Sequence, residues 1–279
     1  MNNEHILIKN LKGWSKNDIT LFITDEPKLS GDPKEVGKLN SDMEKKLRAS
    51  YETTKEKRPT DFNGDKVSVK KITRSQGKLK IVARETDYFT LWGLPHAAPE
   101  LLKKSNEDFI ESKGSDMPCG LYAACMVITS DNKVIMGISS PSHGFGAGRL
   151  SFGFEEQSET SDNNLIETAV RGLKEEFGID ITDEDVKVLG MGKSLNIAYL
   201  SAYCILKVDL TAQEIATLRK KAIDKNEQSC LLAVPLDEVE TLLSENVQVE
   251  DAKKYLIQGN LEGHMSLVQH IANIPRWKL

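Results

Sequence analysis

The 279-residue sequence has no long run of apolar residues and no concentration of basic ones. None of its apolar stretches approaches the ~20 residues that a membrane-spanning helix requires. The first ten residues, MNNEHILIKN, lack the basic and apolar regions of a secretory signal, so we expect none. Lysine and arginine are interspersed with acidic residues, and the formal net charge is −5. These absences predict a protein whose partners include neither a membrane nor a nucleic acid.

Cysteine is scarce, and a disulfide framework is not expected in a chain of this size. The cysteines follow irregular spacings, contain no C-x-x-C pair, and lie within or beside apolar stretches: Cys119, Cys125, Cys204 and Cys230. We interpret them as small buried hydrophobic residues. A reducing, cytoplasmic compartment is the default expectation for such a chain.

The first part of the sequence predicts a small α+β domain. Two strands, a helix, a hairpin and a second helix are expected, in that order, at residues 5–9, 19–24, 33–58, 66–85 and 98–112. Residues 113–120, KGSDMPCG, form the most linker-like stretch. We therefore predict one domain at 1–115 and a second at 116–279.

The second part alternates strands and helices in an order typical of an α+β or mixed-sheet sandwich. Strands are expected at 121–130, 132–140, 149–154, 186–195 and 196–209, and a strand that runs into a helix at 229–246. Helices are expected at 165–177 and 211–223, and one or two more within 252–274. The glycine-rich stretch SHGFGAGR, 142–149, is interpreted as a loop.

The stretch ETAVRGLKEEFGID, 167–180, predicts a short amphipathic helix that ends at Gly178. Residues four apart lie on one face of a helix, so Arg171 stacks on Glu175, and Glu176 projects about 100° further round. An apolar stripe suited to packing on a sheet is formed by Leu165, Ala169, Leu173 and Phe177. Two interpretations remain at this point. The charged face is either a solvated surface with ion pairs worth a few tenths of a kcal/mol each, or a metal-binding face.

Residues upstream of this helix favour the second interpretation, because together they resemble the Nudix box, G-x5-E-x7-R-E-U-x-E-E-x-G-U, in which U is bulky and aliphatic. Gly153 and Glu159 match the first part, and residues 171–179 match eight of the nine terms of the second. The likeness covers roughly residues 117–260. It implies a Nudix-type α/β/α sandwich with a mixed sheet, here preceded by a smaller α+β domain. The overall layout is also faintly similar to that of Nudix UDP-sugar hydrolases.

Two departures from the box stand out. Eleven residues rather than seven separate Glu159 from Arg171, and the sequence TSDNN, 160–164, is interpreted as a small loop insertion. Gly172 occupies the position at which the family has its first metal-binding glutamate. That position lies one turn before Glu176 on the same face, and glycine in a helix interior costs about 1 kcal/mol relative to alanine.

The resemblance implies hydrolysis of a nucleoside diphosphate linked to another moiety, such as a nucleotide sugar, with Mg²⁺ or Mn²⁺ as cofactor. Divalent cations would neutralise the diphosphate and activate water. Glu175 and Glu176 are the expected metal ligands, and Arg171 would orient these carboxylates through an ion pair with Glu159 or Glu175. Candidates to replace the ligand missing at Gly172 are Glu155 and Glu156, for which a solvated acidic loop is an equal alternative.

Further candidates lie outside the box. Glu227, just before a strand, is a candidate base or additional ligand, and Arg149 is a candidate substrate-binding residue. The aromatic cluster of Tyr88, Phe89 and Trp92 either stacks on a base or, as we favour, packs in the interior. The alternative to an enzyme is a catalytically silent Nudix domain that binds a nucleotide as a sensor or interaction module. A third possibility is that residues 1–115 carry the biological function. The oligomeric state is not predicted.

Overall fold

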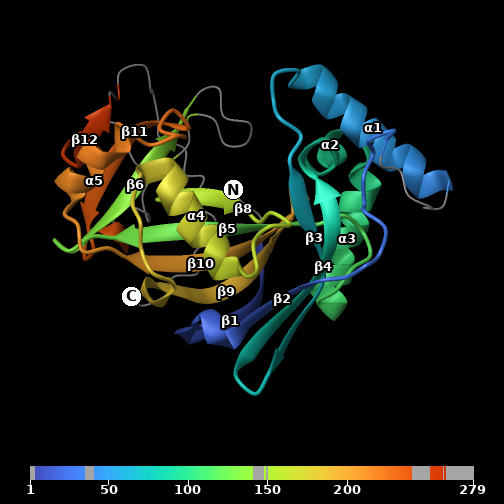
Figure 1. Ribbon diagram of the computed structural model, residues 1–279, viewed down its shortest axis with the longest axis horizontal. Coiled ribbons are helices and arrows are strands. Elements are labelled where there is room, and N and C mark those ends of the chain that lie inside the picture. The colour runs from blue at the N-terminus through green and yellow to red at the C-terminus, as the bar shows by residue number, and fades with distance from the viewer. Residues whose placement is uncertain are drawn as a thin grey trace.

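The structure is a computed structural model that describes residues 4–34, 41–140, 148, 150–240, 252–259 and 261. Its architecture is α+β, built on a mixed sheet (Figure 1). The helices are α1 (Ser41–Lys57), α2 (Tyr88–Ala97), α3 (Pro99–Ser112), α4 (Leu165–Phe177) and α5 (Ala212–Arg219). The described residues include no helix with the length and apolarity needed to span a membrane.

The strands run through the whole chain. They are β1 (Glu4–Trp14), β2 (Ile19–Ile23), β3 (Asp65–Ser75), β4 (Lys78–Asp87), β5 (Gly120–Ile128), β6 (Lys133–Ser139), β7 (Leu150–Phe152), β8 (Phe154–Gln157), β9 (Val186–Ser194), β10 (Tyr199–Lys207), β11 (Gln228–Pro235) and β12 (Leu256–Gly259). One path through the sheet is β1-β9-β10-β5-β3-β4-β2, and a branch leaves β5 through β6 and β11 to β12.

Strand β5 is the centre of this sheet. One edge pairs in parallel with β10 along its full length. The other edge is shared by three strands, because β3 pairs at Gly120, β8 at residues 122–125 and β6 at residues 127–128. Eight of the nine residues of β5 are buried, which explains why its sequence is continuously apolar rather than alternating.

Helix α4 packs its apolar stripe against this part of the sheet, on β5, β8 and β9. The stripe predicted from the sequence is confirmed, since Leu165, Ala169, Leu173 and Phe177 are all completely buried. They join side chains of β5, β9 and β10 in the largest hydrophobic cluster. This packing fixes the height and rotation of α4, and therefore the direction of its charged face.

Helices α1, α2 and α3 gather around β3 and β4 at one end of the molecule, whereas α4 and α5 lie at the other (Figure 1). The expected hairpin is confirmed, with β3 and β4 joined by a turn in which Gln76 and Gly77 both have positive φ. Strand β1 pairs with β9, and it also contacts the hairpin, because the indole N–H of Trp14 donates to the carbonyl of Gly77. The domain limits at 115 and 116 stay a prediction.

Two expectations were wrong in detail. Residues 88–97 form the buried helix α2, which we did not predict, and residues 256–259 form strand β12 where a helix was expected. Strand β12 pairs with β11, so these residues complete a sheet edge. The remainder of the closing helices, 260 and 262–274, lies outside the described residues. The four cysteines are buried and free, as expected.

Candidate functional site

The charged face of α4 is held in place by caps at both ends of the helix. The side chain of Asn164 accepts hydrogen bonds from the backbone N–H groups of Ile166 (2.8 Å) and Glu167 (3.1 Å). Gly178 ends the helix in a left-handed conformation with φ +70°, and its N–H donates to the carbonyl of Lys174. These caps satisfy backbone groups that a helix leaves unpaired at its ends.

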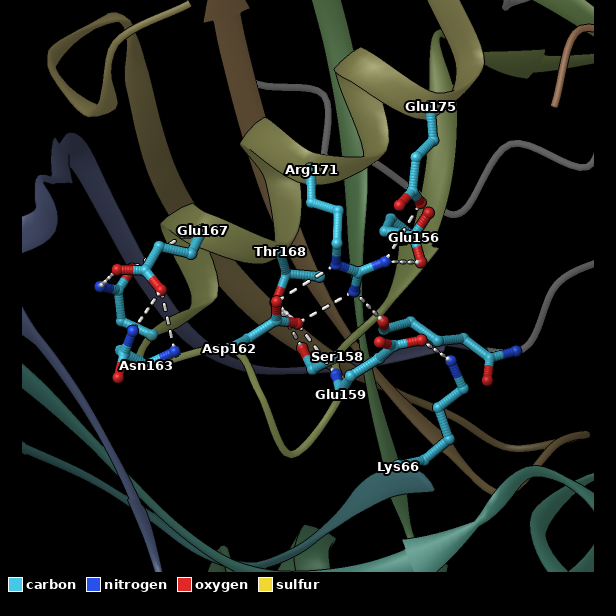
Figure 2. A network of polar contacts seen from close by, with 12 residues as sticks. Lys66, Glu156, Ser158, Glu159, Asp162, Asn163, Glu167, Thr168, Arg171 and Glu175 are labelled. Atoms are coloured by element: carbon cyan, nitrogen blue, oxygen red, sulfur yellow. Dashed lines mark hydrogen bonds and ion pairs between the residues drawn. The ribbon is translucent and has the colours of Figure 1, made fainter. Parts of the chain in front are cut away.

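Arg171 is the centre of a polar network beneath α4 (Figure 2). Its guanidinium donates to both carboxylate oxygens of Asp162, at 3.2 and 3.0 Å, and to Glu156 Oε1 at 2.9 Å. It also donates to Glu175 Oε2 at 3.3 Å and to the carbonyl of Gln157 at 2.8 Å. Burial works against the charge, but Asp162 and Glu156 together raise the pKa of Arg171. The guanidinium thus ties α4 to β8 and to the loop between them.

The partner of Arg171 from this loop is Asp162 rather than Glu159. The carboxylate of Glu159 forms an ion pair with Lys66 of β3 at 2.7 Å, which links the two halves of the chain (Figure 2). Asp162 is buried and also accepts from the Thr168 hydroxyl, at 2.9 Å. Of the two expected partners of Arg171, only Glu175 is found. Asp162 lies in the stretch interpreted as an insertion, so the insertion itself supplies the residue that holds the arginine.

Gly172 faces strand β8 at very short range. A Cβ atom at this position would lie 2.6 Å from the Cβ of Glu156 and 2.6 Å from the ring of Phe154. Both distances are well below van der Waals contact, so no side chain fits while α4 and β8 remain in place. The space that a side chain at position 172 needs is taken by Glu156. Among the candidates for the missing ligand, Glu156 is therefore the one beside the vacant position.

Only glycine fits at position 153, because of its backbone conformation and the closeness of a neighbouring strand. Its φ is +31°, and a Cβ would lie 2.3 Å from the carbonyl oxygen of Cys125. Its N–H donates to the carbonyl of Ile135, and its own carbonyl accepts from the side-chain amide of Gln228. Strands β5, β6 and β11 thus meet at this glycine, which lies between β7 and β8.

Glu176 is 4% exposed and lies in hydrogen-bonding contact with Glu227, which enters from the loop between α5 and β11. Burial first, and next Glu227, raise the pKa of Glu176 well above its usual range, whereas Arg219 lowers it. The second oxygen of Glu176, Oε2, is buried and has no hydrogen-bond partner among the described residues.

Neighbouring carboxyls are perturbed in the same direction. Burial raises the pKa of Glu156 to about 7, although Arg171 opposes this shift and Glu175 adds to it. Burial also raises the pKa of Glu175, against the effect of Arg171. The acidic groups on this face therefore resist carrying all of their negative charges at neutral pH, which is the electrostatic state that a bound cation would relieve.

A pocket of about 620 Å³ opens beside these carboxyls. Its lining comes from both halves of the chain and comprises Arg58, Asp61, Phe62, Gly64, Lys66, Tyr88, Tyr122, Glu155, Glu156, Gln157, Glu159, Ile197, Tyr199, Ile223, Asp224, Asn226 and Glu227. Six of these residues are acidic and two are basic. A diphosphate could therefore enter only together with cations.

The structure thus gathers most of the predicted site residues. Glu155, Glu156 and Glu227 line the pocket, Glu176 contacts Glu227, and Glu175 contacts Arg171. The candidate Arg149 lies outside the described residues. Within the described ranges, no three histidine, cysteine, aspartate or glutamate side chains already stand in an arrangement that could hold a metal ion. Of the aromatic cluster, Phe89 and Trp92 are buried as favoured, but Tyr88 lines the pocket.

No protein-family model matches this chain, and no curated protein sequence matches it. Several similar solved structures are Nudix or MutT proteins. A Nudix hydrolase from Alicyclobacillus acidocaldarius has 11% identity and a TM-score of 0.34, over 47% of this chain and 85% of that one. The Nudix domain of Shewanella oneidensis NrtR, solved with ADP ribose, has 16% identity and a TM-score of 0.33, over 48% and 86%.

A third similar structure is a bifunctional NMN adenylyltransferase/ADP ribose pyrophosphatase from Francisella tularensis, solved with AMP and a Mn ion. It has 14% identity and a TM-score of 0.31, over 53% of this chain and 47% of that one.

Proposed function

We propose that this chain is a Nudix-type hydrolase that cleaves the diphosphate of a nucleoside diphosphate linked to another moiety. The observation that supports this most is the group of carboxyls on and beside α4, at the edge of a pocket large enough for a nucleotide. Four of them, Glu156, Glu175, Glu176 and Glu227, come from three separate segments of the chain. Burial raises the pKa values of Glu156, Glu175 and Glu176, and a structural role would not require such groups to meet in this way.

The chemistry of these side chains suits a divalent cation, which would draw them closer together than they stand in the described structure. The buried Oε2 atom of Glu176 has no partner within the described chain, and the neighbouring carboxyls disfavour one another's ionisation. Carboxylate oxygens are the ligands that Mg²⁺ and Mn²⁺ prefer. Glu176, Glu227 and Glu156 would hold the ion, with Glu175 at its side. When bound, the ion would neutralise phosphate charge and lower the pKa of water.

The remaining residues of the network would position this group. Arg171, gripped by Asp162, holds Glu156 and Glu175 by charge-assisted hydrogen bonds and so fixes their direction. Glu227, at the pocket, would accept a proton from the attacking water, or bind the ion. Glu156 has a pKa of about 7, which also suits a group that takes up and releases a proton near neutral pH.

The second candidate function is nucleotide binding without hydrolysis, and Gly172 favours it. The helix lacks one carboxylate of the box, and no metal-binding cluster is already formed among the described residues. In that case the acidic pocket would still require a divalent cation for binding, and the chain would act as a sensor or interaction module.

The test is hydrolysis of a panel of nucleotide sugars, ADP-ribose, dinucleotides and nucleoside triphosphates with Mg²⁺ or Mn²⁺. ADP-ribose belongs in the panel because the similar NrtR domain was solved with it. We expect metal-dependent turnover that Glu176→Gln abolishes and that Glu111→Gln, at an exposed position of α3, leaves intact. An inactive wild type that nevertheless binds a nucleotide with metal would favour the second function, and equal activity in Glu176→Gln would refute the assignment of this site.

A further inference from the structure

Two of the most exposed large apolar side chains in the described part of the molecule lie at the same pocket. Phe62 is 87% exposed and Ile223 is 79% exposed, and both belong to the lining. They come from different halves of the chain, because Phe62 precedes β3 and Ile223 follows α5. Apolar side chains that meet at the rim of a pocket, with no role in the core, are characteristic of ligand contact.

The loop that carries Phe62 is fastened on both sides. Arg58 and Asp61 form an ion pair within it, and the hydroxyl of Tyr88 donates to Asp61 at 3.2 Å. The N–H of Tyr88 donates to the carbonyl of Gly64, and the N–H of Phe89 donates to the side chain of Asn63 at 2.8 Å. Residues 58–64 are thereby fixed to the start of α2, so the position of Phe62 is preorganised although its ring is exposed.

The basic residues of this wall are engaged by acidic ones. Arg58 is paired with Asp61, and Lys66 is paired with Glu159 at 2.7 Å. They do not offer the isolated positive charge that a phosphate subsite uses. Five of the six acidic lining residues come from the second half of the chain, and the sixth, Asp61, is held by Arg58. With its charged side chains paired in this way, the first half of the chain adds the exposed ring of Phe62 and the ring of Tyr88 to the pocket. Such a wall suits the uncharged ring of a ligand rather than its phosphates.

We propose that Phe62, together with Ile223 from the second half of the chain, binds the aromatic base of a nucleotide whose phosphates lie at the carboxyls. This proposal rests on the proposed function and gives the first half of the chain a role in it, namely recognition of the base. Base stacking tolerates different bases, because every base has a π-face. The ring of Phe62 therefore selects nucleotides from other diphosphates without specifying one base.

The experiment compares two probes that differ by a nucleoside. ADP and inorganic pyrophosphate, each with Mg²⁺, are titrated calorimetrically into the full chain. We expect Phe62→Ala to weaken ADP binding about 10-fold and to leave pyrophosphate binding unchanged, since stacking is lost but the phosphate contacts are not. Phe62→Tyr should restore ADP binding, because it restores the ring. Phe22→Ala is the matched control, since Phe22 is 53% exposed and lies on β2, away from the pocket.

Three results would overturn the proposal: wild type that binds pyrophosphate as tightly as ADP, wild type that binds neither probe, or Phe62→Ala with unchanged affinity for ADP. The hydrolysis panel decides the proposed function separately. A chain that binds ADP through Phe62 but hydrolyses nothing keeps this proposal and refutes the enzyme. An active enzyme whose ADP affinity is unchanged by Phe62→Ala confirms the enzyme and refutes the role of Phe62.

Discussion

Replacing Gly172 by alanine tests the close packing of α4 on β8. In an unobstructed helix interior this change stabilises a protein by about 1 kcal/mol, because alanine loses less backbone entropy. Here the new Cβ would meet the Cβ of Glu156 and the ring of Phe154, each at 2.6 Å. Ordinary carbon contacts lie at 3.5–4.0 Å, so helix and strand would have to separate by about 1 Å.

Neither obstacle moves easily. The Cβ of Glu156 is fixed to the backbone of β8, and Phe154 is 1% exposed with its ring packed on Phe177 at 6.0 Å between centroids. Overpacking of a core costs about 1–3 kcal/mol, which exceeds the helix-propensity gain. We therefore expect Gly172→Ala to lower the free energy of unfolding by about 1 kcal/mol, within a range of roughly 0–2 kcal/mol.

The assay is urea unfolding followed by fluorescence and circular dichroism, with ΔG taken at an unchanged slope against denaturant. Gly64→Ala is the control, since its Cβ would meet nothing closer than 3.5 Å and should not reduce stability by overpacking. Stabilisation of Gly172→Ala by about 1 kcal/mol would refute the close packing and would indicate an unobstructed helix interior at this position. Under the packing described here, Gly172→Glu alone should not restore the missing ligand, because it displaces Glu156.

Three further outcomes are expected. Without divalent cations, Glu176→Gln should raise the melting temperature, because it removes a buried carboxyl that contacts Glu227, and it should abolish stabilisation by Mg²⁺. Calorimetry with and without Mg²⁺ tests both effects, and a lower melting temperature of the metal-free variant would contradict the electrostatic argument. The folded pKa of Glu156 is raised from 4.5 to about 7, so its contribution to stability is fully present below pH 4.5 and is lost as pH rises through 7, by at most about 3 kcal/mol. Urea unfolding in EDTA across this pH range should show a smaller decline of the free energy of unfolding in Glu156→Gln than in wild type, and an identical decline would show that Glu156 is not the titrating group. Arg219 is 3% exposed and donates to the carbonyls of Lys225 and Gln228, which flank Glu227, so Arg219→Lys should weaken the Mg²⁺ affinity measured by calorimetry. Lys220→Met, at the exposed residue directly after the helix, should not, and equal affinities in the two variants would show that Arg219 does not position the site.

The elements predicted well are those whose sequences combine a regular spacing of apolar residues with a residue that ends the element. Helix α4 combines an apolar stripe with a final glycine, and the β3–β4 hairpin combines two alternating runs with a glycine turn. Helix α2 has neither signal, because its sequence is apolar on all sides and contains Pro95. It forms because its apolar residues are buried in the fold, and because buried Asp87 accepts from the N–H of Thr90 at its start. Strand β12 likewise depends on β11 as its partner, which its own four residues do not indicate.

The site shows the same division. The spacing of Arg171, Glu175 and Glu176 follows from helix geometry, so the sequence predicts that Arg171 stacks on Glu175 and that Glu176 projects at a neighbouring angle. Glu227 was a candidate from its place before a strand, and the fold brings it to Glu176 over a long separation in sequence. Asp162 was missed because a changed loop length conceals which acid reaches the arginine. The pocket wall from residues 58–66 is a tertiary arrangement, for which no local pattern exists.

The pairing of β1 with β9 has a consequence for synthesis of the chain. His5 faces Lys193, which the ribosome reaches 188 residues later (193 minus 5). At about 5–20 residues per second, residues 4–14 are made roughly 10–40 s before their partner strand exists. The buried Trp14 on β1 must be accommodated elsewhere during that interval. A fragment that starts at residue 116 would lack β1 altogether, so its β9 would expose a row of backbone N–H and C=O groups to pairing with other chains.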